Sequence, residues 1–531
     1  MNDMPTRSAD AALIAALRDP CRYAHAVSGI ELMETHISWV LLTGEFAYKI
    51  KKPVKLGFLD FTSLEARRLA CEAELRLNRR TAPQLYLEVV PISGSAEHPL
   101  LSDEGTVVEY AVKMRQFPQQ ALLDRMARSG TLAAAHIDCL AGVITAFHAR
   151  IARSGSDDAF GAPAKLLENV SGNFAEIRKL NPPGGDLAVL AELEAWTDSE
   201  HRRLVADFNA RKRDGFVREC HGDLHLGNIA LIDGMPTPFD CIEFNEDFRW
   251  NDVMSEIAFL AMDLVDHRLP GLAYRFLNDS LEQSGDYAGV RVLRFYLVYR
   301  ALVRAKVSCI RAHQPGLAEA DRQRQLRAFR NHLHLARAFA RHRQPALILM
   351  HGLSGSGKTT VSQALLEGLG AIRVRSDVER KRLHGLAREA RSASGVATGL
   401  YQQEASEQTY ATLAGLARDL LESGYPVIVD AAFLRQGVRG NFRKLARDNG
   451  VPFVIVSCQA AESLLRERVA RRDAQATDAS EAGIAVLEHQ LVTQEVLSDD
   501  ESQWAVALDT GHDVDCVQAV AQRLDLATLP A

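Results

Sequence analysis

Two short stretches of this sequence have residue types and spacings suited to phosphoryl transfer. The first, HGDLHLGN at residues 221–228, places Asp223 five residues before Asn228. The spacing of His221, Asp223 and Asn228 matches the H-R-D-x-x-x-x-N loop of enzymes that phosphorylate hydroxyls, with glycine in the second place. Such an aspartate accepts the proton of the acceptor hydroxyl, and the asparagine reaches Mg²⁺ from the same loop. We therefore predict Asp223 as a catalytic residue and Asn228 as a metal ligand.

This loop needs a second metal ligand, because Mg²⁺ is held by several hard oxygen atoms in nearly octahedral geometry. Asp240 lies twelve residues after Asn228 in the stretch TPFDCIEF. We predict that Asp240 binds the metal, and Glu243 in the same stretch is the alternative ligand.

A lysine and a glutamate upstream complete the nucleotide site expected in the first half of the chain. FAYKIKKP supplies Lys49, whose ammonium group can neutralise phosphate oxygens, and Lys51 lies on the same face of that strand. The following helix supplies an acidic partner that orients the lysine. Glu74 is the favoured partner and Glu72 the alternative. We predict Lys49 and Glu74 as ATP-binding residues.

The second stretch, GLSGSGKTT at residues 352–360, fits the phosphate-binding pattern G-x-x-x-x-G-K-[ST]. Its glycines let backbone N–H groups curl around the β-phosphate, its lysine neutralises the β- and γ-phosphate oxygens, and a threonine hydroxyl binds Mg²⁺. The predicted ATP contacts are Gly352, Gly355, Gly357, Lys358, Thr359 and Thr360, and Thr359 is also a predicted metal ligand.

Two acids and two arginines follow this motif. Asp377 closes AIRVRSD and Asp430 closes YPVIVD. We predict that Asp430 holds Mg²⁺ and that Asp377 accepts the proton of an acceptor hydroxyl, whereas a helix N-cap is the alternative role for each acid. The helix LLRERVARR carries Arg468 and Arg472, which we predict to contact the γ-phosphate of ATP. A solvated helix face is the alternative there.

The elements that must position the first set of residues form an α+β pattern. The first 110 residues read as strands and one helix, and ISWVLLTGEFAYKI predicts a hairpin that turns at Gly44-Glu45. The helix starts at Thr62 or Ser63 as its N-cap. Helical periodicity covers residues 122–210, with a break at NPPGG (181–185), and resumes over 252–312.

The second set of residues lies in a region of a different pattern. After a charged helix, short apolar strands alternate with helices, which predicts a parallel α/β sheet with its ligand crevice at the carboxyl ends of the strands. Both Asp377 and Asp430 would then face the phosphates. We predict a first domain over residues 1–316, a connecting helix over 317–344 and a second domain over 345–531.

With these parts, residues 25–310 resemble the aminoglycoside phosphotransferase family, which has a protein-kinase-like fold. HGDLHLGN is similar to the family's HGDLHPGN, with Leu226 in place of the proline, and FDCIEF stands where the family has an IDFE-like strand. NDVMSEIAFL resembles the family's DPxxDLA helix. The resemblance implies that Asp252 is a structural acid that supports the catalytic loop.

Residues 345–530 resemble the small P-loop kinases of the AAA-labelled type, such as gluconate-kinase-like enzymes, the kinase domain of polynucleotide kinases and zeta-toxin-like kinases. The resemblance rests on GLSGSGKTT, RSDVERKRL, VIVDAAFL and LLRERVARR. It implies that Asp377 contacts or deprotonates the acceptor and that Arg380 binds the acceptor or a phosphate.

Composition limits the other classes of function. The 531 residues carry a net charge of −6, which argues against a broad nucleic-acid-binding surface and leaves a polynucleotide end as one acceptor among several. Eight scattered cysteines with no CxxC pair indicate reduced thiols in the cytoplasm. No apolar run is long enough to span a membrane, and we expect no membrane partner.

We therefore predict an ATP- and Mg²⁺-dependent kinase with two nucleotide sites that phosphorylates hydroxyls of small molecules. Two alternatives stay open. In one, a single kinase domain is active and the other is a nucleotide-binding sensor that regulates it. In the other, the chain is a non-catalytic binding module switched by nucleotide. The sequence makes no prediction of oligomeric state or of either acceptor.

Overall fold

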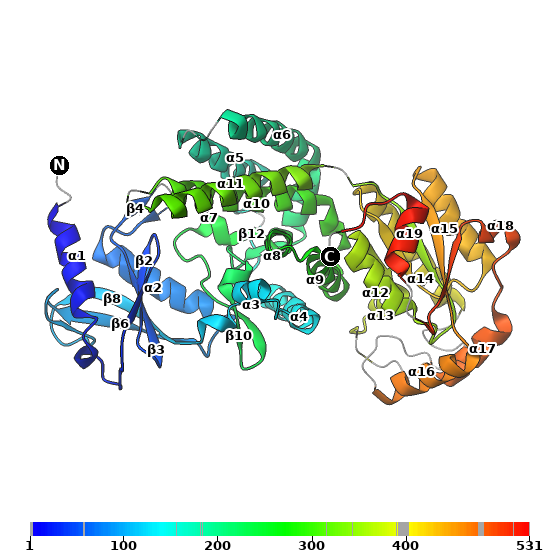
Figure 1. Ribbon diagram of the computed structural model, residues 1–531, viewed down its shortest axis with the longest axis horizontal. Coiled ribbons are helices and arrows are strands. Elements are labelled where there is room, and N and C mark those ends of the chain that lie inside the picture. Colours follow the sequence, from blue (N-terminus) through cyan, green and yellow to red (C-terminus); the bar gives the residue numbers. More distant parts are fainter. Residues whose placement is uncertain are drawn as a thin grey trace. The chain divides into compact units, whose positions relative to one another are not determined.

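A computed structural model describes residues 4–56, 59–155, 157–180, 182, 184–314, 316–341, 343–388, 390, 403–475, 483–512 and 515–529. The chain forms two compact units, each assembled from two stretches of sequence. The first unit combines Met1–Lys165 with Ala210–Glu256, and the second combines Leu166–Asn209 with Ile257–Ala531. Figure 1 traces their elements along the chain.

A six-stranded antiparallel sheet lies in the first unit, in the order β1-β2-β3-β8-β6-β7. The strands are β1 Glu31–Glu34, β2 Ser38–Leu42, β3 Phe46–Lys51, β6 Tyr86–Gly94, β7 Pro99–Leu100 and β8 Val107–Arg115. The hairpin prediction is confirmed, because β2 and β3 pair across a turn in which Thr43 N–H donates to Phe46 O.

Helices cover both faces of this sheet. The helix α2 (Leu64–Asn78) begins after Ser63, whose hydroxyl accepts from Ala66 N–H, so Ser63 and not Thr62 is the N-cap. On the opposite face, α1 (Met4–Ala16) contributes to a core with Tyr48 and Ile50 of β3. Because side chains alternate along a strand, Lys49 and Lys51 point toward α2 instead.

The rest of the first unit consists of short elements around the loop at residues 221–228. The bounds are η1 Pro20–Arg22, β4 Lys55–Leu56, β5 Leu59–Asp60, η2 Gln119–Ala121, α3 Leu123–Ser129, α4 Ala134–Arg150, β9 Val217–Glu219, η3 Leu226–Asn228, β10 Ile229–Ile232, β11 Met235–Pro238, α7 Glu246–Arg249 and β12 Trp250–Asp252. The strand β9 pairs with β12 and β10 pairs with β11, so the loop at residues 221–228 is held between two small antiparallel ribbons.

Long helices form much of the second unit. They are α5 Pro163–Lys179, α6 Gly184–Arg213, α8 Val253–Asp266, α9 Pro270–Ser284, α10 Val290–Ala312 and α11 Glu319–Ala340, with η4 Tyr287–Gly289, and α5, α6 and α8 also give residues to the first unit. Of the predicted break at 181–185, residue 182 lies between α5 and α6, residues 184 and 185 begin α6, and residues 181 and 183 lie outside the described residues.

The charged helix that the sequence predicts as a connector packs closely on other helices. Figure 1 shows α11 alongside α10, and the two are in extensive contact. Ion pairs join α11 to α6, from Arg330 to Asp186 and from Arg337 to Glu192. Apolar residues such as Phe329 and Leu333 are buried. Some of the charged side chains of α11 therefore form ion pairs within the second unit.

The parallel sheet predicted for the second half is confirmed. Its strands are β13 Leu347–His351, β14 Ile372–Arg375, β15 Val427–Asp430, β16 Phe453–Gln459 and β17 Ala505–Asp509, in the order β14-β15-β13-β16-β17. All four pairings are parallel. The accompanying helices are α12 Lys358–Leu369, α13 Ser376–Leu383, α14 Gln403–Glu422, α15 Gln436–Asp448, α16 Glu462–Gln475, α17 Ile484–Thr493, α18 Asp499–Ser502 and α19 Cys516–Leu524.

Both faces of this sheet are buried, which explains its short continuous apolar strands. Ile348 and Met350 pack with residues of α12 and α19 on one face. Leu347 and Leu349 alternate with them along the strand, so they point to the other face, where they are also buried. The helix α14 packs on the neighbouring strands β14 and β15. Among the described residues, no helix is both long enough and apolar enough to cross a membrane.

Candidate active sites

The first candidate site is built around two lysines of β3. Lys49 Nζ donates to Glu74 Oε1 at 2.8 Å, and Lys51 donates to the other oxygen of the same carboxylate. Glu74 is completely buried in α2. Glu72 lies on the exposed side of that helix and pairs with Arg68. The structure therefore brings Glu74, and not Glu72, to Lys49.

The two acids of FDCIEF meet the same lysines in different surroundings. Asp240 pairs with Lys49 and keeps 42% of its side chain exposed, whereas Glu243 pairs with Lys51 and is sealed from solvent. Asp240 also has a φ of 63°, in the left-handed region that few residues other than glycine, asparagine and aspartate adopt, and its N–H donates to the hydroxyl of Tyr86. Of the two acids, Asp240 is the one with an open side for a metal ion.

The charges in this cluster favour an added cation. Two lysines face three carboxylates, those of Glu74, Asp240 and Glu243, so the formal sum is 2 − 3 = −1. Burial alone would lower the pKa of Lys49, but the adjacent carboxylates outweigh it and raise that pKa well above its usual value. The lysine thus stays charged, and a divalent cation fits the remaining negative charge.

The loop at residues 221–228 places its own polar groups close together. Asn228 Nδ2 donates to Asp223 Oδ2 and to Asp223 O, both at 3.0 Å. This contact leaves the carbonyl oxygen as the atom with which Asn228 would bind a metal. The ring of His221 is buried and forms a 2.9 Å hydrogen bond with Phe239 O, and burial lowers the pKa of His221. The side chain of Asp223 is 36% exposed, as a group that receives an acceptor hydroxyl must be.

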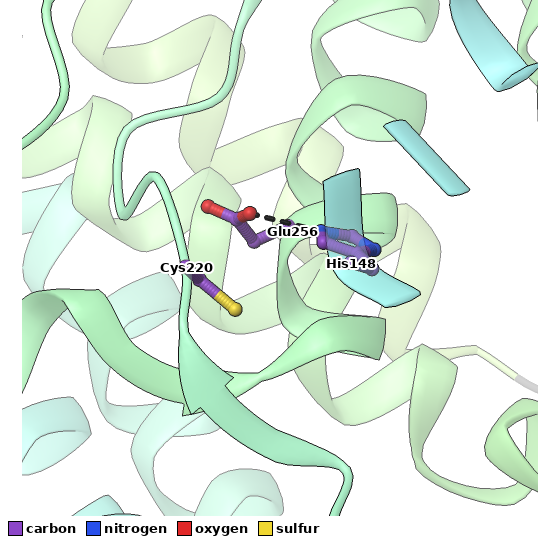
Figure 2. Close-up of side chains that lie close together, drawn as sticks. All are labelled: His148, Cys220 and Glu256. Atoms are coloured by element: carbon purple, nitrogen blue, oxygen red, sulfur yellow. Dashed lines mark hydrogen bonds and ion pairs between the residues drawn. The ribbon is translucent and has the colours of Figure 1, made fainter. Parts of the chain in front are cut away.

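A buried carboxylate that the sequence analysis missed supports this loop. Glu256 of α8 accepts from Gly222 N–H at 2.5 Å. It also accepts from His148 Nε2 at 3.0 Å, as Figure 2 shows. Burial would raise the pKa of Glu256, but the hydrogen bond and charge of His148 lower it to about 2. Gly222 has a φ of 89°, and a Cβ there would lie 2.9 Å from Phe248 O. Only glycine therefore fits where the loop passes so close to the backbone of Phe248.

Asp252, the acid that the sequence analysis named as a support of the loop, makes its contacts elsewhere. Asp252 forms a two-pronged ion pair with Arg211 and accepts from Met254 N–H at the start of α8. Asp252 therefore anchors the helix from which Glu256, one turn later, reaches the loop. The spacing of Asp252 and Glu256 by four residues was the available signal, because such residues lie on one side of a helix.

Cys220 lies beside this acid–histidine pair. Ligand atoms of His148, Cys220 and Glu256 are all within 4.8 Å of one another, close enough in principle for a metal ion (Figure 2). His148 and Glu256 already hydrogen-bond to each other, and Glu256 also holds the loop backbone. Through these contacts His148 and Glu256 support the backbone of the loop at residues 221–228.

The second candidate site begins where β13 ends. The loop after His351 turns into α12 at Lys358, and three of its glycines have positive φ: Gly352 at 143°, Gly355 at 81° and Gly357 at 82°. A Cβ on Gly355 would lie 2.7 Å from the backbone oxygen of Leu465. The loop therefore needs glycine both for its backbone angle and for its close packing on α16.

The lysine and the strand-end acid of this site face the loop. Lys358 Nζ donates to Gly352 O and Leu353 O, both at 2.8 Å, and burial lowers the pKa of Lys358. Asp430, the last residue of β15, is buried and accepts from Ser362 Oγ at 2.9 Å. Ser362 was not predicted as a site residue, because nothing in the motif marks a serine one turn into α12.

Asp377 lies in the first turn of α13, with Arg380 Nη1 at 3.4 Å from its carboxylate. Arg375 is the N-cap residue of α13, and Asp430 ends a strand that no helix follows directly. Neither acid is thus a helix N-cap. Arg468 donates to Thr510 Oγ1 at 3.0 Å and to Thr510 O at 2.7 Å.

A cavity of about 1160 Å³ brings these residues together. Of the predicted site residues, those that line it are Gly355, Gly357, Lys358, Thr359, Thr360, Asp377, Asp430, Arg468 and Arg472. Gly352 contributes the carbonyl that Lys358 contacts. Tyr410, Arg375 and Arg435 also line the cavity and were not predicted. Arg375 is the first residue of RSDVERKRL and Arg435 follows VIVDAAFL, so their places beside these motifs were the available signal, whereas Tyr410 lies far from any motif.

Comparisons with known proteins find one family model, and relatives that match almost the whole chain. Residues 347–497 match a family model described as an AAA domain. The chain is 32% identical over 496 residues to the uncharacterized protein Rv2004c of Mycobacterium tuberculosis, covering 93% of this chain and 94% of the relative. An uncharacterized protein of Mycobacterium bovis, Mb2027c, gives the same figures.

Solved structures are similar to separate parts of the chain. An unliganded sugar kinase from Janibacter is 19% identical, with a TM-score of 0.28, and the match covers 34% of this chain and 96% of that one. The amicoumacin kinase hAmiN is 12% identical, with a TM-score of 0.39, and the match covers 64% of this chain and 96% of that one.

Proposed function

We propose that this chain, which belongs to the family of the mycobacterial protein Rv2004c, is an ATP- and Mg²⁺-dependent phosphotransferase with two nucleotide sites. One observation carries the proposal. Each compact unit contains its own lysine and its own acids suited to a metal ion and to an acceptor hydroxyl. The sets share no residue, so each is complete without the other.

At the first site, Asp223 orients the acceptor hydroxyl and receives its proton. The hydroxyl oxygen forms a bond to the γ-phosphorus, the bond from that phosphorus to the bridging oxygen of ADP breaks, and ADP leaves with the electron pair. Lys49, held by Glu74, neutralises phosphate oxygens, and Asn228 and Asp240 hold Mg²⁺. Mg²⁺ supplies neutralisation of phosphate charge when bound.

At the second site, the backbone of the loop at residues 352–357 and Lys358 hold the phosphates, and Thr359 and Asp430 hold Mg²⁺. Asp377 orients the second acceptor, and Arg468 and Arg472 lie on the side of the cavity formed by α16. Because both sites act through fixed charges and positioning, they need no covalent intermediate.

The charges of the second cavity favour an acceptor that itself carries a negative charge. The basic residues that line it are Lys358, Arg375, Arg380, Arg435, Arg468, Arg471 and Arg472. The acidic ones are Asp377, Glu407, Asp430 and Asp509. Tyr410 lies within electrostatic range of Arg380, Arg435 and Asp377, so cations surround the catalytic acid as well as the phosphate loop. A sugar acid or another small anionic alcohol suits this environment.

We further propose that residues 1–316 and 345–531 are the two functional domains, joined through α11, and that the protein works in the cytoplasm, where its eight free cysteines stay reduced. A regulatory role for one site is the second candidate. The ion pair between Asp240 and Lys49 favours it, because Mg²⁺ would share Asp240 with the lysine.

Transfer of label from [γ-³²P]ATP to a metabolite extract tests the proposal. The wild type is expected to give two labelled products. Asp223→Ala should remove one of them and Lys358→Ala the other. If Lys358→Ala instead changes the rate of the product that depends on Asp223, the second site is a regulator. If ATP binds at both sites and no product forms, the chain is a nucleotide-switched binding module.

A further inference from the structure

The edge strand of the parallel sheet is covered by a side chain from a helix that precedes the sheet in sequence. β14 is the edge strand that leads to Asp377. Asn278 of α9 donates from Nδ2 to Ala371 O at 2.9 Å and accepts from Arg373 N–H at 2.7 Å. One buried amide thus satisfies a donor and an acceptor of the strand edge, as a further strand would.

A buried glutamate one turn later on α9 gathers the arginines of this strand. Glu282 is 1% exposed and accepts from Arg373 Nε at 3.1 Å and Nη2 at 2.9 Å. Its second oxygen lies 3.6 Å from Arg375 Nη1 and 3.8 Å from Arg388 Nη1. Burial would raise the pKa of Glu282, but the arginines around it lower that pKa, so the carboxylate is ionised.

The contacts continue from Glu282 to the phosphate site. Arg373 Nη1 donates to Ser362 Oγ at 3.2 Å, and Ser362 Oγ donates to Asp430 Oδ2 at 2.9 Å. The same hydroxyl lies 3.1 Å from Thr359 O, and because it has one proton, the nearer and charged acceptor, Asp430, is favoured. A second branch runs through Arg375, which lines the cavity beside the start of α13.

We propose that Glu282 is a positioning residue of the second site, although it lies outside the sheet that forms that site. Through Arg373 and Ser362 it orients Asp430 toward the metal, and through Arg375 it sets a cation in the cavity. The helix α9 is therefore part of the phosphotransfer machinery of the P-loop half. This inference rests on the proposed function of that site.

Magnesium-dependent nucleotide binding to the full chain tests the inference. Titrations of a non-hydrolysable ATP analogue with Mg²⁺ and with EDTA use a chain that carries Asp240→Asn, so that the metal-dependent part comes from the second site. Adding Glu282→Gln keeps the shape of the side chain and removes its charge. We expect the gain in affinity from Mg²⁺ to fall about 10-fold or more, the usual size of an effect passed through a neighbour of a metal ligand.

Glu367→Gln is the matched control. Glu367 of α12 accepts from Arg275 of α9 at 2.8 Å, so this variant breaks an ion pair between α9 and the same half of the chain without touching β14. In Glu367→Gln, Mg²⁺ should raise the affinity for the ATP analogue by as much as it does in the parent chain that carries Asp240→Asn alone. An equal loss in Glu282→Gln and Glu367→Gln would overturn the inference, because it would mark a general packing effect.

Ser362→Ala provides a second route to the same result. It removes one hydroxyl from the path between Arg373 and Asp430 and should reproduce the loss of Mg²⁺ dependence with little change in thermal unfolding. If binding in EDTA and binding with Mg²⁺ fall together in both variants, Glu282 is structural and the inference is wrong. A parent chain that binds no nucleotide with Mg²⁺ would overturn the proposed function itself.

Discussion

The two candidate sites are built from different parts of the chain. The first draws side chains from four separate segments, at Lys49, Glu74, Asp223 and Asp240, and pairs its charges with one another. The second takes most of its predicted contacts from one loop, residues 352–360, and leaves them around an open cavity. A site made of paired side chains depends on each ion pair, whereas a site made of backbone depends on the path of its loop.

The largest expected effect separates the two acids that receive acceptor protons. Asp223→Asn should lower transfer at the first site by about 10²–10⁴-fold, because an amide cannot accept the proton, and Asp377→Asn should do the same at the second. Quantifying both labelled products from one reaction checks this. Loss of both products in either variant would contradict the independence of the sites.

The next effect concerns the buried ion pairs of the first site. Glu74→Gln leaves two buried lysines short of a counter-charge and should lower the free energy of unfolding of the first unit by about 3–5 kcal/mol. Urea denaturation measures this. Glu72→Gln, on the exposed side of the same helix, should change it by less than about 0.5 kcal/mol. If the two variants lose similar amounts of unfolding free energy, the ion pairs of Glu74 do not stabilise the first unit.

A smaller effect concerns how the stability of each unit depends on pH. His351, beside the phosphate loop, has its pKa lowered to about 4 by burial and by nearby Arg439 and Lys358. Because the unfolded chain binds this proton at higher pH than the folded chain, stability falls as pH drops from about 6.5 to about 4. Glu256 of the first unit, with its pKa lowered to about 2, loses its contribution only as pH falls below about 4.5.

Urea unfolding should show that His351→Gln reduces, by about 2 kcal/mol, the stability lost between pH 7 and pH 5. The loss that remains in the variant includes His221 of the first unit, whose pKa burial also lowers. Glu256→Gln should leave the difference between these two pH values almost unchanged. A wild type equally stable at both values would contradict the assignment to His351.

The smallest effect tests the backbone of the second site. Gly355→Ala places a Cβ against the oxygen of Leu465 at a positive φ and should weaken nucleotide binding at the second site about 10-fold, with the first site unaffected. Equilibrium binding of an ATP analogue measures both sites. The matched control is Gly440→Ala within α15, where a Cβ meets no atom within 4 Å. Equal binding in the two variants would show that the loop adapts.

Much of the fold follows from local patterns. Alternation of side chains in FAYKIKKP places Lys49 and Lys51 on one face, and the Ser63 cap marks the start of α2. The run from ALILM to the phosphate loop predicts a strand, a turn and a helix, as the structure has them. These predictions succeed because each depends on residues within about ten positions of one another.

The sequence by itself determined the loop at 352–360, the order of lysine and acids in the first half, and the types of both folds. Only the tertiary structure decided that Lys49 meets Glu74, that Asp240 keeps an open side while Glu243 is sealed, and that Glu256 and Glu282 support the two sites. The reason is physical. Contacts within a turn or a strand obey fixed periodicities, whereas the partner of a buried charge depends on how distant elements dock, and no local spacing records that.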